Sequence, residues 1–226
     1  MLSITIDGPS GAGKSTISRM IAQKLGFIYV DTGAMYRTVA LYMLENGIEL
    51  SDGQAVAAAL GGVSIGVEYS DGVQRMYLGD RDVSDDIRRP ELSLAASAVS
   101  AIPAVRAFLL ETQRSFARGH DVIMDGRDAG TTVLPDADLK IFLTATPEDR
   151  AMRRYLEQKK LGFDVDFNEL LADINKRDYN DSHRDISPLT RAPDAILIDT
   201  TGNELEKSVD ILYRTITEKL RLAGND

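Results

Sequence analysis

Hydrophobic residues along this chain form short continuous runs, and the stretches between the runs carry them every three or four positions. The continuous runs are three to five residues long, rich in Ile, Val and Leu, and bounded by polar residues. This pattern is typical of strands covered on both faces, as in a parallel sheet flanked by helices. We therefore expect five parallel strands, at residues 3–6, 27–30, 122–124, 139–143 and 195–198.

Helical spacing fills most of the intervals between these runs. Ile17, Ile21 and Leu25 lie one turn apart and predict a helix directly after the first strand. A second apolar stripe, which ends at Leu44, predicts a helix over about residues 34–46. Further helices are expected over about residues 91–102, 104–117, 147–160 and 205–220, and from near Asn168.

The periodicity changes to strict alternation between residues 63 and 83. It predicts an antiparallel hairpin that turns at Ser70, Asp71 and Gly72, and it leaves a third strand open. Ser51 and Gln54 form a capping-box pattern for a short helix just before this segment.

The chain therefore reads as one α/β domain of 226 residues with an insertion. The core is expected at 1–33 and 119–226. Residues 34–118, with the β insert at about 63–83, are expected to form an acceptor-binding subdomain that can close.

The strongest chemical signal lies between the first strand and the first helix. The sequence Gly-Pro-Ser-Gly-Ala-Gly-Lys-Ser has the Gly-x-x-x-x-Gly-Lys-Ser spacing of a loop that wraps a nucleoside triphosphate. Its backbone N–H groups and the following helix N-terminus attract phosphate, Lys14 adds a charge, and the Ser15 hydroxyl is placed for Mg²⁺. A glycine-rich turn without a ligand is the alternative. The predicted ATP site comprises Gly8, Pro9, Ser10, Gly11, Ala12, Gly13, Lys14, Ser15 and Thr16.

Composition narrows the possible partners. The formal net charge of -9 argues against coating a nucleic acid or a membrane surface, so anion binding has to be local. The chain has no cysteine, which rules out disulfides and thiolate metal sites. It has only two histidines, His120 and His183, which are too few and too scattered to suggest a metal site built from imidazole. With no leader and no membrane-length apolar run in this sequence, we expect a cytoplasmic protein and a monomer.

Charged residues follow the predicted strands, at the edge where open α/β sheets bind ligands. Asp125 ends the third run and is a candidate for the metal, directly or through water, although a turn-forming Asp-Gly is an equal alternative. Arg37 and Arg127 could hold an anionic acceptor. For Arg37 taken alone, a solvated helix face is the favoured explanation.

Two more groups of arginines occur late in the chain. Arg177, Asp181 and Arg184 have the spacing of one helix face and could aim at a nucleotide, or form an ordinary ion pair. Arg150, Arg153 and Arg154 crowd one helix, and at least one of them is expected to contact the donor. We choose Arg153 as the donor contact and leave the other two open.

The acceptor is expected to be a nucleotide phosphate. An alcohol would need a base to remove its proton, whereas a phosphate with a second pKa of about 6 is already an anionic nucleophile. A site rich in arginine and without histidine suits the phosphate, which points to a nucleoside monophosphate kinase. The alternatives are another small P-loop kinase, for adenylate, shikimate or a sugar, and a nucleotide-binding switch that transfers nothing.

Several segments together resemble the bacterial-type cytidylate kinase family. They are Ile-Thr-Ile-Asp-Gly-Pro-Ser-Gly-Ala-Gly-Lys at 4–14, Asp-Thr-Gly-Ala-Met-Tyr-Arg at 31–37, Asp-Gly-Arg-Asp at 125–128, Pro-Asp-Ala at 135–137, Lys-Ile-Phe-Leu at 140–143, Asp-Ala at 194–195 and Asp-Thr-Thr at 199–201.

The resemblance implies an enzyme that uses MgATP to phosphorylate CMP or dCMP, with UMP a poorer acceptor. It assigns the acceptor phosphate to Arg37, Arg127 and Arg184, the sugar to Arg177 and Asp181, and cytosine to Ser97, Arg106 and Asp128. Thr32 is a further residue expected to bind CMP, and it stands where some members carry Ser. Residues 155–167 resemble the short lid of the family. Lys14, Arg127, Arg184 and Asp125 are then the catalytic candidates.

Overall fold

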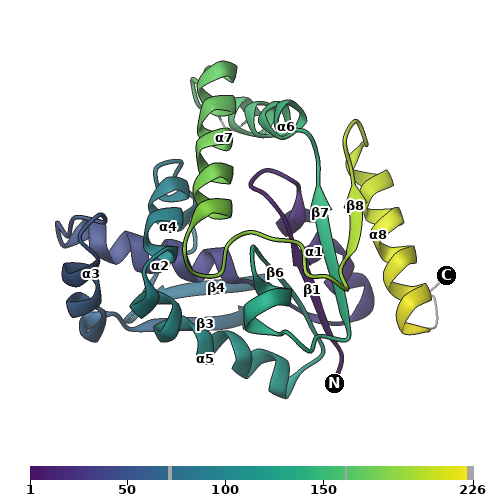
Figure 1. The fold of residues 1–226 in the computed structure, drawn as a ribbon, viewed down its shortest axis with the longest axis horizontal. Coiled ribbons are helices and arrows are strands. Elements are labelled where there is room, and N and C mark those ends of the chain that lie inside the picture. The colour runs from purple at the N-terminus through teal and green to yellow at the C-terminus, as the bar shows by residue number, and fades with distance from the viewer. Residues whose placement is uncertain (71–72, 161, 223–226) are drawn as a thin grey trace.

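The computed structural model describes residues 1–70, 73–160 and 162–222 and has a central parallel sheet with helices on both faces (Figure 1). Within these residues the sheet has five strands in the order β2-β6-β1-β7-β8, all paired in parallel. Each predicted run is one of these strands, and the predicted fold class is confirmed. The strands are β1 (Ser3–Asp7), β2 (Ile28–Asp31), β6 (Val122–Gly126), β7 (Leu139–Thr144) and β8 (Ile196–Asp199).

Register brings acidic strand ends to one edge of the sheet. Asp31 lies beside Asp125, and Ile6 also lies beside Asp125 from the other side, so that Asp7 is one residue further along. Parallel strands end together, which explains why residues far apart in sequence meet here.

The helices cover the sheet in two layers, each with its own hydrophobic cluster. Ile123 packs toward α1 and α8, whereas Val122 and Met124 pack toward α2, α4 and α5. Alternate residues of a strand face opposite sides, so one buried strand serves both clusters. The helices are α1 (Lys14–Leu25), α2 (Thr32–Glu45), α3 (Gly53–Ala59), α4 (Leu92–Ser100), α5 (Pro103–Gly119), α6 (Pro147–Lys160), α7 (Phe167–His183) and α8 (Leu205–Leu220).

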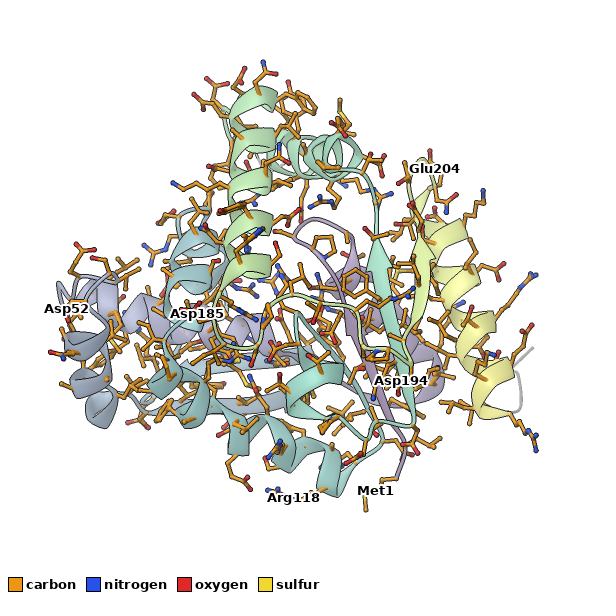
Figure 2. All side chains as sticks on the ribbon, viewed as in Figure 1. Met1, Asp52, Arg118, Asp185, Asp194 and Glu204 are labelled. Carbon is orange, nitrogen blue, oxygen red and sulfur yellow. The ribbon has the colours of Figure 1, made fainter. Side chains whose placement is uncertain are left out.

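Three details of the helices differ from prediction. The side chain that caps α3 is that of Asp52, which accepts hydrogen bonds from the N–H groups of Gln54 and Ala55, so the predicted cap at Ser51 is wrong. Asp52 lies at the α3 end of the molecule (Figure 2). Leu44 is exposed rather than part of the buried stripe of α2. Arg184 lies just past α7 in extended backbone, not on its face.

A small antiparallel sheet is inserted between α3 and α4. Its strands are β3 (Ile65–Ser70), β4 (Val73–Leu78) and β5 (Arg81–Asp82), so a third strand does follow the hairpin. The turn predicted at Ser70, Asp71 and Gly72 extends outside the described residues. Met76 of β4 is buried against the α2 layer, which attaches this sheet to the core.

Within the described part of the chain, no single helix is long and apolar enough to cross a membrane. Helices α4 and α5 together meet that criterion by length and composition, but they are bent by 97° at their junction.

Candidate active site

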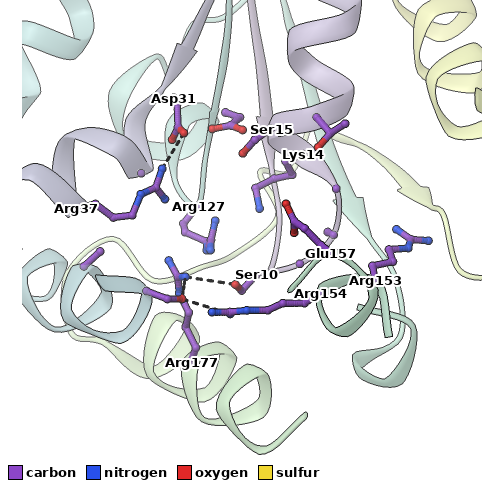
Figure 3. Close-up of a pocket in the computed structure, with 18 of the residues that line it drawn as sticks. Ser10, Lys14, Ser15, Asp31, Arg37, Arg127, Arg153, Arg154, Glu157 and Arg177 are labelled. Atoms are coloured by element: carbon purple, nitrogen blue, oxygen red, sulfur yellow. Dashed lines mark hydrogen bonds and ion pairs between the residues drawn. The ribbon is translucent and has the colours of Figure 1, made fainter. Parts of the chain in front are cut away.

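A cavity of about 710 Å³ opens at the carboxyl edge of the sheet, between the loop after β1, helices α2 and α4, and helices α6 and α7 (Figure 3). Most of the residues predicted for the site line it. These are Ser10, Gly11, Ala12, Gly13, Lys14, Ser15, Thr16, Thr32, Arg37, Ser97, Asp125, Arg127, Asp128, Arg153, Arg177, Asp181 and Arg184.

The loop at residues 8–15 has the backbone that the motif predicts. Gly8 has φ +150°, and a Cβ there would lie 2.0 Å from the carbonyl oxygen of Leu143, so no other residue fits. Gly13 has a left-handed backbone and begins α1 without a side-chain cap. The N–H groups at the start of α1 therefore remain available to an anion.

Lys14 is buried at the base of this loop. Its ammonium group donates hydrogen bonds to the carbonyl oxygens of Gly8 and Pro9, both at 2.8 Å. Gly8 and Pro9 do not line the cavity, and their carbonyls instead hold the lysine. Burial, together with Arg127, keeps the pKa of Lys14 well below its usual value. An anion at the loop would compensate both effects.

An acidic corner faces the start of α1. Burial and the neighbouring Asp31 raise the pKa of Asp125 to about 6, although Lys14, Ser15 and Tyr29 act in the opposite direction. The Tyr29 hydroxyl donates to Asp125 at 3.0 Å. A serine hydroxyl and a carboxylate beside a phosphate-binding loop fit Mg²⁺, which keeps waters and substrate phosphates as most of its ligands.

Arg37 reaches the cavity from α2. Its guanidinium pairs with Asp31 at 2.9 Å, and Asp31 also caps α2 by accepting from the N–H of Ala34 at 2.8 Å. Among the described residues, the buried Nε of Arg37 has no hydrogen-bond partner. Unpaired donors of this kind are costly unless a ligand accepts from them.

Asp128 lines the cavity and is held by two arginines. Arg106, which lies behind the lining, pairs with one carboxylate oxygen, and Arg184 pairs with the other at 3.2 Å. Arg106 also donates to the Ser100 carbonyl at 3.1 Å and sits over the ring of Tyr36. The carboxylate is thus fixed from both sides and faces the open space.

The carboxylate of Asp181 lies close to two further arginines of the cavity, Arg127 and Arg177. Asp181 accepts from Ser97 at 2.7 Å and from Arg127 at 2.9 Å, and Arg177 lies 3.7 Å away. Burial raises the pKa of Asp181, but Arg127 and Arg177 outweigh it and the net pKa is lowered. Burial and Arg127 lower the pKa of Arg177 to about 9. Although Arg184 lies beyond α7, the chain turns inward there, and the nearby Asp185 is near the middle of the molecule (Figure 2).

The three arginines of α6 have different positions. Arg150 is buried under the loop and does not line the cavity, whereas Arg153 and Arg154 do. Arg153 pairs with Asp149 at 2.5 Å and donates to the Thr200 carbonyl at 2.6 Å. Arg154 points across the opening (Figure 3).

Several cavity residues were not selected from the sequence. Asp31 precedes the predicted site residue Thr32, and Arg154 is the neighbour of Arg153 whose role the sequence leaves open. Ser93, which accepts from Arg177 at 2.5 Å, sits in a plain alanine-rich helix and gives no signal. Of the described residues that line the cavity, nine have cationic and six have acidic side chains, in a chain whose net charge is -9. The cavity therefore attracts anions.

The parallel sheet, the loop around Lys14 and the facing arginines define a P-loop nucleotide-binding protein of the α/β class. The family model described as cytidylate kinase matches residues 4–218. The chain belongs to the cytidylate kinase family, as the resemblance predicted.

Similar proteins extend over almost the whole chain. A cytidylate kinase of Caldicellulosiruptor bescii is 48% identical over 97% of this chain and 99% of its own. A cytidylate kinase of Leuconostoc mesenteroides is 50% identical over 91% of this chain and 92% of its own. The crystal structure of an uncharacterized protein from Eubacterium ventriosum, 12% identical, covers 96% of this chain and 98% of its own with a TM-score of 0.51, and shares the fold alone.

Proposed function

We propose that this chain transfers the γ-phosphoryl group of ATP to the phosphate of CMP or dCMP, releasing ADP and CDP or dCDP. The observation that carries the proposal is one cavity with two facing anion sites. One is the loop around Lys14, and the other is formed by the arginines on α2, just after β6, on α7 and just after α7. Family membership supports the same reaction. It does not favour an adenylate or shikimate kinase, nor a switch without transfer.

The donor phosphates belong in the loop at residues 8–15. Backbone N–H groups and the start of α1 hold the β and γ phosphates, and Lys14 moves from the Gly8 and Pro9 carbonyls to the phosphate oxygens. Arg153 and Arg154, which line the same side of the cavity, flank the donor.

Ser15 and Asp125 would hold Mg²⁺, Asp125 directly or through water. When bound, Mg²⁺ would supply positive charge against the negative charge that develops on the phosphates during transfer. The raised pKa of Asp125 fits this assignment, because a cation beside it would restore the charged form.

The acceptor belongs in the opposite half. Arg37, Arg127 and Arg184 grip its phosphate, and Arg177 with Asp181 holds the sugar. Ser97, Arg106 and Asp128 recognise cytosine, whose exocyclic amine can donate to the fixed carboxylate of Asp128. Thr32, whose hydroxyl donates to the Asp125 carbonyl at 2.7 Å, supports the floor between the two halves.

Transfer needs no general base. The acceptor phosphate is an anion near neutral pH, so the protein has to overcome repulsion between two anions and align them. Lys14, Arg127 and Arg184 all line the cavity, and we assign that compensation to them.

The domain movements, oligomeric state, cellular location and partners of this enzyme stay predictions. They are the closure of residues 34–118 with the β insert at about 63–83, and of a lid at 155–167, of which Leu161 lies outside the described residues. A monomeric state, a cytoplasmic location and the lack of nucleic-acid or membrane partners are predictions of the same kind.

A coupled assay of ADP release with MgATP tests the function. CMP, dCMP, UMP, AMP and shikimate are compared side by side, with Lys14→Met as the inactive control. We expect fast turnover with CMP and dCMP, slower turnover with UMP, and none with AMP or shikimate. Preference for AMP or shikimate, or ATP binding without turnover of CMP, would overturn the proposal.

A further inference from the structure

We propose that Gln74, on strand β4 of the inserted sheet, is a positioning residue that orients Arg37 through Asp31. This inference rests on the proposed function, since it concerns the end of the cavity that takes the acceptor phosphate. Gln74 does not line the main cavity, so it acts through its neighbours.

The geometry begins with the edge of the main sheet. Among the residues that the structure describes, strand β2 is the outermost strand of the main sheet and pairs only with β6, so no described strand pairs with the outward backbone groups of Asp31. The amide of Gln74 replaces that strand. Its Oε1 accepts from the Asp31 N–H at 2.8 Å, and its Nε2 donates to the Asp31 carbonyl at 3.3 Å.

These two hydrogen bonds hold the backbone of Asp31, whose side chain has three further interactions. The Asp31 carboxylate caps α2 at Ala34, pairs with Arg37 at 2.9 Å and lies beside Asp125 in the sheet register. A rotation of the Asp31 backbone would move both carboxylate oxygens, and Arg37 would move with them.

Packing alone does not fix this pair. A second cavity of about 210 Å³ lies beside it, lined by Gln74, Asp31 and Arg37 among others. Side chains next to open space have room for other rotamers, so the specific hydrogen bonds of Gln74 supply the restraint. Gln74 suits this place because its amide carries a donor and an acceptor together.

The inserted sheet thereby gains a defined role. Strand β4 is anchored to the α2 layer by the buried Met76, two residues from Gln74, and the Gln74 amide also donates to the Met76 sulfur at 3.1 Å. The Gln74 side chain therefore links the position of the small sheet to that of Asp31.

The test compares Gln74→Met, which keeps a similar volume but loses both hydrogen bonds, with Gln74→Asn, which keeps the amide but is too short to reach. Gln54→Met on α3, where the side chain is exposed, is the matched control. Each variant is assayed with MgATP and CMP. We expect KM for CMP to rise about ten-fold in both Gln74 variants, the size of one net hydrogen bond, with KM for ATP and kcat unchanged.

A double-mutant cycle of Gln74→Met with Arg37→Met distinguishes the positioning of Arg37 by Gln74 from a general loss of structure. If Gln74 acts through Arg37, Gln74→Met has less than a roughly two-fold effect on KM for CMP when Arg37 is already replaced. The inference is overturned if Gln74→Met raises KM for CMP equally with and without Arg37, or if both Gln74 variants keep the wild-type KM. CMP turnover by the wild type would still uphold the proposed function in either case. Absence of CMP turnover in the wild type overturns the function and this inference together.

Amide hydrogen exchange of the substrate-free protein supplies a readout without activity. The N–H of Asp31 is expected to exchange at least about ten-fold faster in both Gln74 variants than in wild type or Gln54→Met. An unchanged exchange rate would overturn the contact on which the inference depends.

Discussion

Arg150 and Asp178 form a 2.6 Å ion pair that holds Ser10 of the phosphate-binding loop from both sides. Arg150 donates to the Ser10 carbonyl at 2.8 Å, and the Ser10 N–H donates to Asp178 at 3.3 Å. The pair joins α6 to α7, so these two helices and the loop form one hydrogen-bonded unit. The third residue of the loop is thereby fixed by groups some 140 and 168 positions away in sequence.

Replacing Arg150 should therefore weaken both the fold and the donor site. In Arg150→Met the partly buried Asp178 loses its partner and the Ser10 carbonyl loses its donor. We expect the free energy of unfolding to fall by about 3 kcal/mol, the lower end of the range for breaking a buried pair. KM for ATP should rise more than KM for CMP.

Urea denaturation and steady-state kinetics measure these two effects. Arg191→Met, which removes an exposed arginine, is the control and should change neither. If the Arg150 variant unfolds at the wild-type urea concentration, the pair does not stabilise the loop as described.

The strands and the phosphate-binding loop of the site could be predicted from the sequence, but which arginines of α6 line the cavity could not. Strand runs and the Gly-x-x-x-x-Gly-Lys-Ser spacing depend on local periodicity and backbone conformation, and both are visible in the sequence. Arg150, Arg153 and Arg154 lie within about one helical turn, and the docking of α6 on the loop decides which of them faces the ligand. That docking depends on contacts between distant elements.

The same limit applies after β6 and at the inserted sheet. Ala129–Val133 forms a π-helical turn, and Asp7 holds its start by accepting from the N–H groups of Ala129 and Gly130, at 2.8 and 2.7 Å. Gln74 meets Asp31 only once both sheets are assembled. Neither contact has a local pattern, so sequence reasoning had no means of finding it.

Asp128 provides a test of the assignment to cytosine. Asp128→Ala removes the acceptor for the exocyclic amine and leaves Arg106 and Arg184 without their carboxylate. We expect KM for CMP to rise by roughly 30-fold or more, equivalent to about 2 kcal/mol for a hydrogen bond to a charged group. KM for ATP should change much less.

Asp136→Ala, at an exposed aspartate after the same strand, is the matched control and should leave both constants unchanged. Initial rates over a matrix of CMP and ATP concentrations give both values in one experiment. Equal increases for the two substrates would assign Asp128 to the structure of the cavity rather than to the base.

Asp7 should make the stability of the protein depend on pH. It is buried under the π-helical turn, and burial raises its pKa from 3.8 to about 6 despite the hydrogen bonds from Gly130 and Ala129. The folded state therefore holds the proton more tightly than the unfolded chain. Stability from this group is fully present below pH 3.8 and is lost as the pH rises through about 6.

Between about pH 5 and pH 7.5, this linkage amounts to about 1.4 kcal/mol of unfolding free energy. Asp7→Asn cannot titrate, so its stability should lack that loss, and the difference between wild type and variant should shift by this amount across the interval. Urea denaturation at several pH values measures the shift, with Asp136→Asn as the exposed control. Parallel pH profiles for wild type and Asp7→Asn would show that the buried carboxyl keeps an ordinary pKa, because only a raised folded-state pKa links its protonation to folding in this range.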